Sequence, residues 1–316
     1  IAEDDTGSAG DTVAAIISSA GGDRITDVDT GAVEGLAVIG VDDSNGTWQY
    51  DAGSGWTAFG AVTNTSAVLL DTTSSIRFVP DASYTGSAGD ITFRAWDTTS
   101  GSDGDTAVDV STNGTTTAYS TDTETATLTV TGVNDAPVLT PSTPTLTTIS
   151  EDDTNNSGQL ISAIVTTDIT DIDGGAVEGI AITSLNSSNG TWEYDTGSGW
   201  TAVGAVTNTS ALLLRATDSL RFVPDGANSD SASVTYRAWD QTSGTAGNKE
   251  TTASNGGSTA FSTATDTASI TVTAVNDAPV LDNSGNMVLT DIAEDDTGSA
   301  GDTVAAIISS AGGDRI

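Results

Sequence analysis

The chain has 316 residues with no cysteine and no histidine, which excludes disulfide bonds, thiolate metal sites, cysteine nucleophiles and histidine bases. Its 8 Lys and Arg residues stand against 44 Asp and Glu residues, so the formal net charge is -36. Nucleic acid and acidic membrane surfaces bind basic footprints. We therefore expect no nucleic-acid partner and no membrane insertion, and we expect divalent cations to bind.

The elements of residues 1–137 are predicted to be short strands separated by turns. Apolar runs and alternation predict strands at residues 36–39, 47–51, 55–59, 67–70, 76–79, 91–96 and 125–133. The second and third of these form a hairpin around Ala52-Gly53-Ser54. The spacing of the turn signals is typical of an all-β fold built as a β-sandwich.

Two stretches are harder to assign. Residues 12–17 have helical apolar spacing, but their β-branched side chains favour a strand. Residues 97–124 are rich in Ser, Thr, Gly and Asp, and we expect them and their counterpart, residues 240–266, to form long solvated loops.

The whole pattern is then repeated along the chain. Asn45-Gly46-Thr47-Trp48 returns as Asn189-Gly190-Thr191-Trp192, and all six tryptophans fall into matched pairs: Trp48 with Trp192, Trp56 with Trp200, and Trp96 with Trp239. Residues 1–25 are identical to residues 292–316. We predict two homologous domains, 1–137 and 138–279, and the start of a third at 280–316, within a longer array.

A linker sequence closes each domain. Val-Asn-Asp-Ala-Pro-Val-Leu occurs at 133–139 and again at 275–281, each time after an alternating strand. Proline cannot continue a central strand, and the preceding Asn and Asp offer oxygen atoms at the end of a domain. The interpretation is a cation-binding linker, and the alternative is a plain turn, which both residues favour.

Three acidic patterns recur around these linkers. The Glu-Asp-Asp triplet lies at 3–5, 151–153 and 294–296, Asp-x-Asp lies at 27–29 and 171–173, and a single Asp ends a strand at 97 and 240. Side chains two residues apart in an extended chain share one face, so two carboxylates would meet there and repel without a cation. Calcium takes about 6 to 8 hard oxygen ligands in loose geometry, whereas magnesium demands a tight octahedron.

The order of these motifs resembles that of cadherin repeats, and more closely the cadherin-like repeats of giant RTX-type bacterial surface adhesins. Val133-Asn134-Asp135-Ala136-Pro137 resembles the cadherin linker Asp-x-Asn-Asp-Asn-x-Pro, and Ala238-Trp239-Asp240 resembles its Ala-x-Asp motif. The resemblance implies tandem immunoglobulin-like or cadherin-like sandwiches with Ca²⁺ at their junctions.

The resemblance also implies a set of metal ligands. The complete junction would use Glu3, Asn134, Asp135, Asp171, Asp173 and Asp240. Two partial junctions would use Glu151, Asn276 and Asp277, and Asp27, Asp29 and Asp97.

The chain departs from the family pattern in two places. The family's Asp-Arg-Glu motif is absent, which leaves Asp81 and Asp225 as candidates for its role. Ala136 and Ala278 stand where cadherins often place Asn, so we expect fewer ions per junction.

The predicted function is that of a calcium-stiffened structural repeat in a long extracellular or cell-surface adhesin stalk or fibre. Its partners would be neighbouring repeats of the same chain or identical chains, with a cell-surface or glycan target. The alternatives are a self-assembling surface filament and a β-sandwich that binds a glycan through its tryptophans, although aromatic residues are more often used in packing. No enzyme is expected, since near-identical duplicated domains suit a spacer better than a catalyst.

Overall fold

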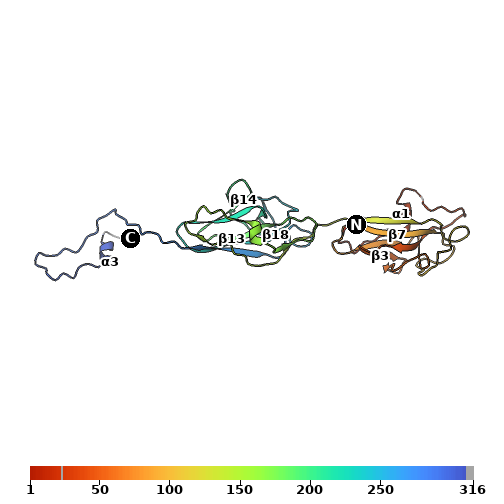
Figure 1. Ribbon diagram of the computed structural model, residues 1–316, viewed down its shortest axis with the longest axis horizontal. Coiled ribbons are helices and arrows are strands. Elements are labelled where there is room, and N and C mark those ends of the chain that lie inside the picture. The colour runs from red at the N-terminus through yellow and green to blue at the C-terminus, as the bar shows by residue number, and fades with distance from the viewer. Residues whose placement is uncertain (23, 311–316) are drawn as a thin grey trace. The chain divides into compact units, whose positions relative to one another are not determined.

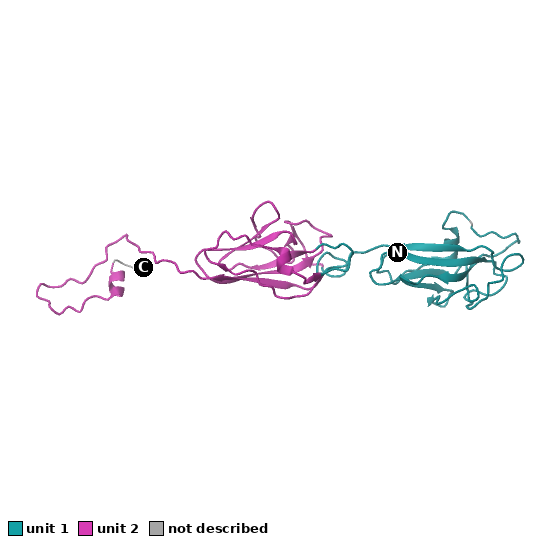
Figure 2. Ribbon diagram, viewed as in Figure 1, with its two compact units in different colours: residues 1–137, 170–177, 255–262 teal, residues 138–169, 178–254, 263–316 magenta. Residues whose placement is uncertain are grey.

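The computed structural model describes residues 1–22 and 24–310, and its contacts divide the chain into two compact units (Figures 1 and 2). Unit 1 holds residues 1–137, 170–177 and 255–262, and unit 2 holds residues 138–169, 178–254 and those from 263 onward. Two loops of the second sequence repeat, 170–177 and 255–262, thus group with unit 1.

Unit 1 contains two antiparallel four-stranded sheets, in agreement with the strands predicted from the sequence. The first has the order β1 (Asp11–Thr12), β6 (Ser75–Pro80), β3 (Gly46–Asp51), β4 (Thr57–Ala58). The second has the order β5 (Val68–Asp71), β2 (Gly35–Val41), β7 (Gly86–Trp96), β8 (Glu124–Val130). The hairpin of β3 and β4 turns at residues 52–56, around the predicted tripeptide.

Alternating side chains from both sheets of unit 1 form one core. Trp48 and Tyr50 of β3 are buried together with Ile76 and Phe78 of β6, and the rings of Trp48 and Phe78 lie 5.1 Å apart. The same cluster contains Leu36 of β2 and other residues of the second sheet. Two sheets that share their inner faces make a β-sandwich, so the all-β fold class is confirmed.

The strand favoured at residues 12–17 is wrong, because this segment forms helix α1 (Val13–Ser18). The Thr12 hydroxyl accepts a hydrogen bond from the Ala15 amide at 3.2 Å and caps the helix. Val13 and Ile17, one turn apart, are both buried. The cap and this shared buried face outweigh the intrinsic strand preference of β-branched residues.

The prediction of a solvated loop at 97–124 is wrong in part. Val110, Ala118 and Tyr119 are buried and pack with Trp96 and Leu69 in a second, smaller core. A few apolar residues in a polar stretch thus suffice to fold the loop over the outer face of the second sheet.

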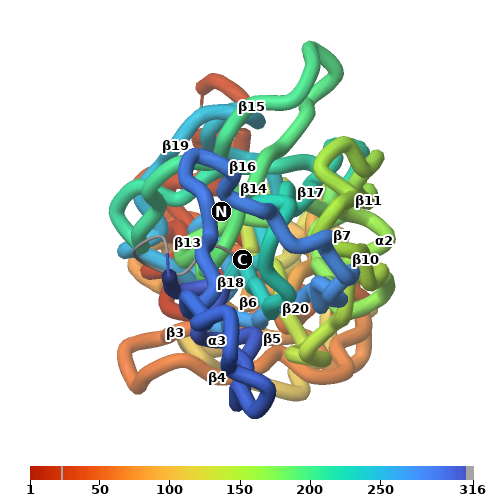
Figure 3. Tube along the Cα trace, turned by 90° about the vertical axis from the view of Figure 1, so that its left-hand side faces the viewer, coloured from red at the N-terminus to blue at the C-terminus, as the bar shows by residue number. Residues whose placement is uncertain are grey.

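Unit 2 repeats this architecture with a larger sheet, whose strands are all labelled in Figure 3. That sheet has the order β10 (Ile149–Ser150), β20 (Asp266–Thr273), β18 (Asp230–Trp239), β13 (Gly179–Asn186), β16 (Ala211–Arg215), β19 (Lys249–Glu250). The other sheet has the order β11 (Gln159–Leu160), β17 (Ser219–Pro224), β14 (Gly190–Asp195), β15 (Thr201–Ala202), and helix α2 spans Ile161–Val165. A separate pair joins β9 (Val138–Leu139) to β12 (Ile169–Thr170).

The stretch from residue 280 to residue 310 contains helix α3 (Val304–Ser309), and no strand is assigned within it. Val304 is 71% exposed, whereas Val13, its counterpart in the identical segment of unit 1, is 0% exposed. Throughout the part of the chain that the structure describes, no helix is long and apolar enough to span a membrane.

Candidate metal centre

Glu3 is fixed where the last strand of the first sandwich runs into the linker. Its amide donates to the Thr131 carbonyl at 3.0 Å, and its Oε1 accepts from the Val133 amide at 2.7 Å. The side chain is 6% exposed. Both hydrogen bonds hold the carboxylate of Glu3 against the first residues of the linker.

Asp135 of the linker is tied to the loop that carries the Asp-x-Asp motif. Its amide donates to Asp173 Oδ2 at 2.9 Å, and the Asp173 amide in turn donates to Asp171 Oδ1, also at 2.9 Å. Asp171 therefore uses one carboxylate oxygen to accept a hydrogen bond within its own loop. The Asp-x-Asp motif forms a bend, and its two aspartates do not lie in an extended strand.

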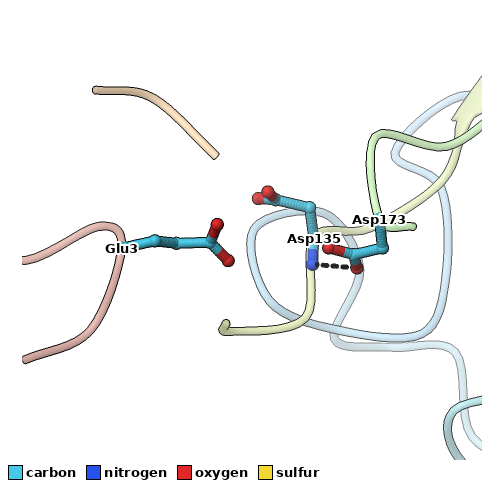
Figure 4. A group of neighbouring side chains, drawn as sticks. All are labelled: Glu3, Asp135 and Asp173. Atoms are coloured by element: carbon cyan, nitrogen blue, oxygen red, sulfur yellow. Dashed lines mark hydrogen bonds between the residues drawn. The ribbon is translucent and has the colours of Figure 1, made fainter. Parts of the chain in front are cut away.

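Three carboxylates converge at this point. Glu3, Asp135 and Asp173 each offer an oxygen, and these oxygens all lie within 4.8 Å of one another. Figure 4 shows the carboxylate of Glu3 directed at those of the two aspartates. Two full charges at that separation repel by about 1 kcal/mol in water and by about 3.5 kcal/mol at an effective dielectric constant near 20. A cation among these oxygens would turn the repulsion into attraction.

The linker is fixed further by one backbone and one side-chain hydrogen bond within unit 1. The Ala136 amide donates to the Gly257 carbonyl at 2.7 Å, and Asn134 Nδ2 donates to the Thr259 carbonyl at 3.3 Å. The loop 255–262 thus holds the two residues on either side of Asp135.

Asp240 and Asp97 occupy equivalent places in the two units, each in a local turn. Asp240 is 3% exposed and its Oδ1 accepts from the Thr242 amide at 2.8 Å and from the Thr242 hydroxyl at 2.6 Å. Asp97 makes the same two bonds to Thr99. Neither belongs to the group of three carboxylates.

The residues predicted for the partial junctions lie apart from that group. Glu151 is buried and its Oε1 accepts from the Val275 amide at 2.6 Å, which repeats the contact of Glu3 with Val133. Asn276 and Asp277 are exposed. Asp27 and Asp29 are exposed as well, and the Asp29 amide donates to Asp27 Oδ1 at 2.8 Å.

The two aspartates that were candidates for the missing family motif also lie outside the group. Asp225 accepts from the side chain of Asn228 and from the Ala227 amide, and these bonds lower the pKa of its carboxyl. Asp81 is exposed.

Two buried acids of unit 2 escaped the sequence reasoning. One is Asp218, which is 2% exposed and pairs with Arg215 at 2.7 Å, and the other is Asp266. Asp266 in unit 2 is 4% exposed, and its carboxylate accepts from the Ser142 and Thr143 amides and, at 3.4 Å, from the Tyr236 hydroxyl. Burial and then the charge of Asp266 raise the pKa of the Tyr236 hydroxyl. The only sequence signal was the change from Phe93 and Glu124 in the first repeat to Tyr236 and Asp266 in the second.

The tryptophans serve packing in this structure. Trp48, Trp96, Trp192 and Trp239 are buried. Trp56 and Trp200 are partly exposed, and their rings are covered by the guanidinium groups of Arg77 at 4.3 Å and Arg221 at 4.2 Å.

No protein-family model and no curated protein matches the chain. Among solved structures, the crystal structure of human mucin-like protocadherin EC1-2 is similar at 12% sequence identity and a TM-score of 0.34, over 79% of this chain and 92% of that one.

Proposed function

We propose that the chain is part of a calcium-stiffened tandem repeat, of the cadherin-like kind, in a long extracellular or cell-surface adhesin stalk or fibre. The observation that carries this proposal is the convergence of Glu3, Asp135 and Asp173. They come from the first turn of the chain, the linker and a loop of the second repeat. One ion there would fasten three separate stretches of chain together.

Calcium suits these residues better than other common cations. The group offers carboxylate oxygens, and the chain contains no thiolate or imidazole ligand. Hard oxygen ligands in irregular geometry favour Ca²⁺, while Mg²⁺ requires a tight octahedron and Zn²⁺ prefers nitrogen and sulfur.

The test is calorimetric melting of the 316-residue chain in calcium and in chelator. A ligand present at 100 times its dissociation constant stabilises the folded state by about 2.7 kcal/mol. For units of this size we expect the melting temperature to be higher by roughly 9 °C in calcium. Magnesium at the same ionic strength is the control and should give a smaller shift. An unchanged melting temperature would count against the proposal.

A further inference from the structure

In unit 2 the first segment of chain, residues 138–151, and the last strand, β20, run side by side in the same direction. β10 pairs in parallel with β20 through Ile149 and Val272. Nearer the start of both segments, Thr145 forms a parallel bridge with Ser269. Because parallel partners start at the same end, a pull on the start of the first segment against a pull on the end of β20 slides the two segments along each other.

Several main-chain hydrogen bonds resist that sliding. The Leu146 amide donates to the Ser269 carbonyl at 2.8 Å, and the Ser269 amide donates to the Pro144 carbonyl at 3.0 Å. The Glu151 amide donates to the Thr273 carbonyl, also at 3.0 Å. Such bonds connect the two segments at even spacing along a parallel pair. Sliding strains them together, whereas peeling the segments apart from one end breaks them one after another.

Two leucines anchor the first segment in the core of unit 2. Leu139 is 3% exposed and Leu146 is 6% exposed, and both belong to the core cluster that contains Ile270 and Val272 of β20. A shift by one residue would turn these side chains away from the core, because neighbouring positions of an extended chain face opposite sides of the sheet. The leucines thus oppose the same motion as the hydrogen bonds.

Asp266, at the start of β20, holds the first segment between Pro141 and Pro144. Its buried carboxylate accepts from the Ser142 amide at 2.9 Å and from the Thr143 amide at 3.1 Å. Hydrogen bonds to a charged acceptor are about twice as strong as neutral ones. Thr143 has a φ of 54°, in the left-handed region that a β-branched residue rarely adopts. The carboxylate therefore stabilises a backbone conformation that is unfavourable for this segment alone.

We propose that residues 138–151 and β20 form a clamp that resists tension applied along unit 2, with Asp266 as its side-chain anchor. One linker, 133–139, leads into the first segment, and the other, 275–281, follows β20, so tension between the two linkers loads the clamp in the sliding direction. The biological use of the clamp rests on the proposed function, because a stalk carries load. The clamp itself acts through hydrogen bonds and apolar contacts and does not require calcium.

The first experiment compares two pulling directions on single molecules of the 316-residue chain, in calcium and in chelator. The chain has no cysteine, so pairs of introduced cysteines at exposed positions define where the handles attach. Val138→Cys with Val275→Cys loads the clamp by sliding, and Val138→Cys with Thr265→Cys peels it open from its start. We expect the first pair to rupture at a force at least about twofold higher, because several hydrogen bonds then break together. Equal forces in the two directions would overturn the proposal.

The second experiment tests the anchor in the sliding direction. Asp266→Asn, added to the chain with handles at 138 and 275, should lower the rupture force by about a third, because a neutral acceptor replaces a charged one. Asp218→Asn is the matched control, since Asp218 is also a buried acid of unit 2 but pairs with Arg215 outside the clamp. It should lower the melting temperature of unit 2 and leave the rupture force near that of the parent. Equal falls in force would show that general stability sets the force and would refute the role of Asp266.

The clamp and the calcium site give separable results. A higher sliding force that persists in chelator, alongside calcium-insensitive melting, would leave the clamp standing while refuting the calcium proposal. Equal forces in the two directions, alongside a melting temperature that rises in calcium, would refute the clamp alone.

Discussion

Glu3 and Glu151 make the same hydrogen bond to a linker amide, but among the described residues only Glu3 belongs to a group of three carboxylates. Glu3→Gln keeps an oxygen that can accept from Val133 while removing one negative charge from the group. We expect calcium affinity to fall by about tenfold or more, equivalent to about 1.4 kcal/mol. Titration calorimetry measures it.

Glu151→Gln is the control for that variant, since it alters an identical local contact outside the group. Its calcium affinity should stay near that of the parent chain. Equal losses in the two variants would show that the charge of Glu3 has no special role in binding the ion.

Tyr236 gives a prediction for alkaline pH. Burial and the neighbouring Asp266 raise the pKa of its hydroxyl above the ordinary value of about 10. A group whose pKa is raised on folding contributes stability that is fully present below its unfolded pKa and is lost as the pH climbs toward its folded pKa. Tyr236→Phe should therefore make the stability of unit 2 less sensitive to pH above about 10, as followed by denaturant unfolding.

A steeper alkaline loss in Tyr236→Phe than in the parent would contradict this reasoning. The first repeat supplies a natural precedent for the variant, because Phe93 occupies the same position in β7.

At the residue scale, the sequence identified the acids but not which of their oxygens are already engaged. Glu3, Asp135 and Asp173 were expected together, and the structure brings them together. Asp171 and Asp240 each accept hydrogen bonds from a residue two positions later in the chain. Such local capping depends on the backbone torsion angles of each bend, which motif spacing does not specify.

At the scale of elements, helices α1 and α3 have the same sequence, so the effect of one Val→Ala substitution can be compared at a buried and at an exposed position. Val13→Ala removes two methyl groups from a fully buried position and should lower the free energy of unfolding of unit 1 by about 2 kcal/mol. Val304→Ala alters the identical sequence where the side chain is 71% exposed, and its effect should stay within about 0.5 kcal/mol. Denaturant titration gives both values, and similar costs would contradict the burial argument.

The strands could be predicted because alternation reports directly on which face is buried, as in Trp48 and Tyr50 of β3. Helix α1 could not, because Thr12 as a cap and the buried pair of Val13 and Ile17 compete with strand propensity in so short a segment. The folded loop at 97–124 escaped prediction because its apolar residues are widely spaced and meet only through contacts distant in sequence, such as Tyr119 with Trp96.

For the whole molecule, we expect the two units to unfold in separate transitions, with unit 2 the more stable. Unit 2 has residues 138–147 hydrogen-bonded along β20 and the ion pair of Arg215 with the buried Asp218 at 2.7 Å. Differential scanning calorimetry should resolve two peaks. Val13→Ala should move the lower peak and Leu139→Ser the upper one, and the reverse assignment would refute the ranking.

The duplication was evident from the sequence, since the paired tryptophans mark it. It was not evident from the sequence that residues 170–177 and 255–262 of the second repeat group with unit 1. Nothing in the composition of these two loops distinguishes them from other polar loops.

Residues 13–18 and 304–309 have the same six-residue sequence but differ in how far their side chains are buried. An antibody that needs the side chains of Val-Ala-Ala-Ile-Ile-Ser would find them accessible at 304–309 and covered at 13–18, where Val13 and Ile17 are buried. The antibody would thus bind the folded chain at 304–309 alone, and the copy at 13–18 would become accessible only once unit 1 had opened.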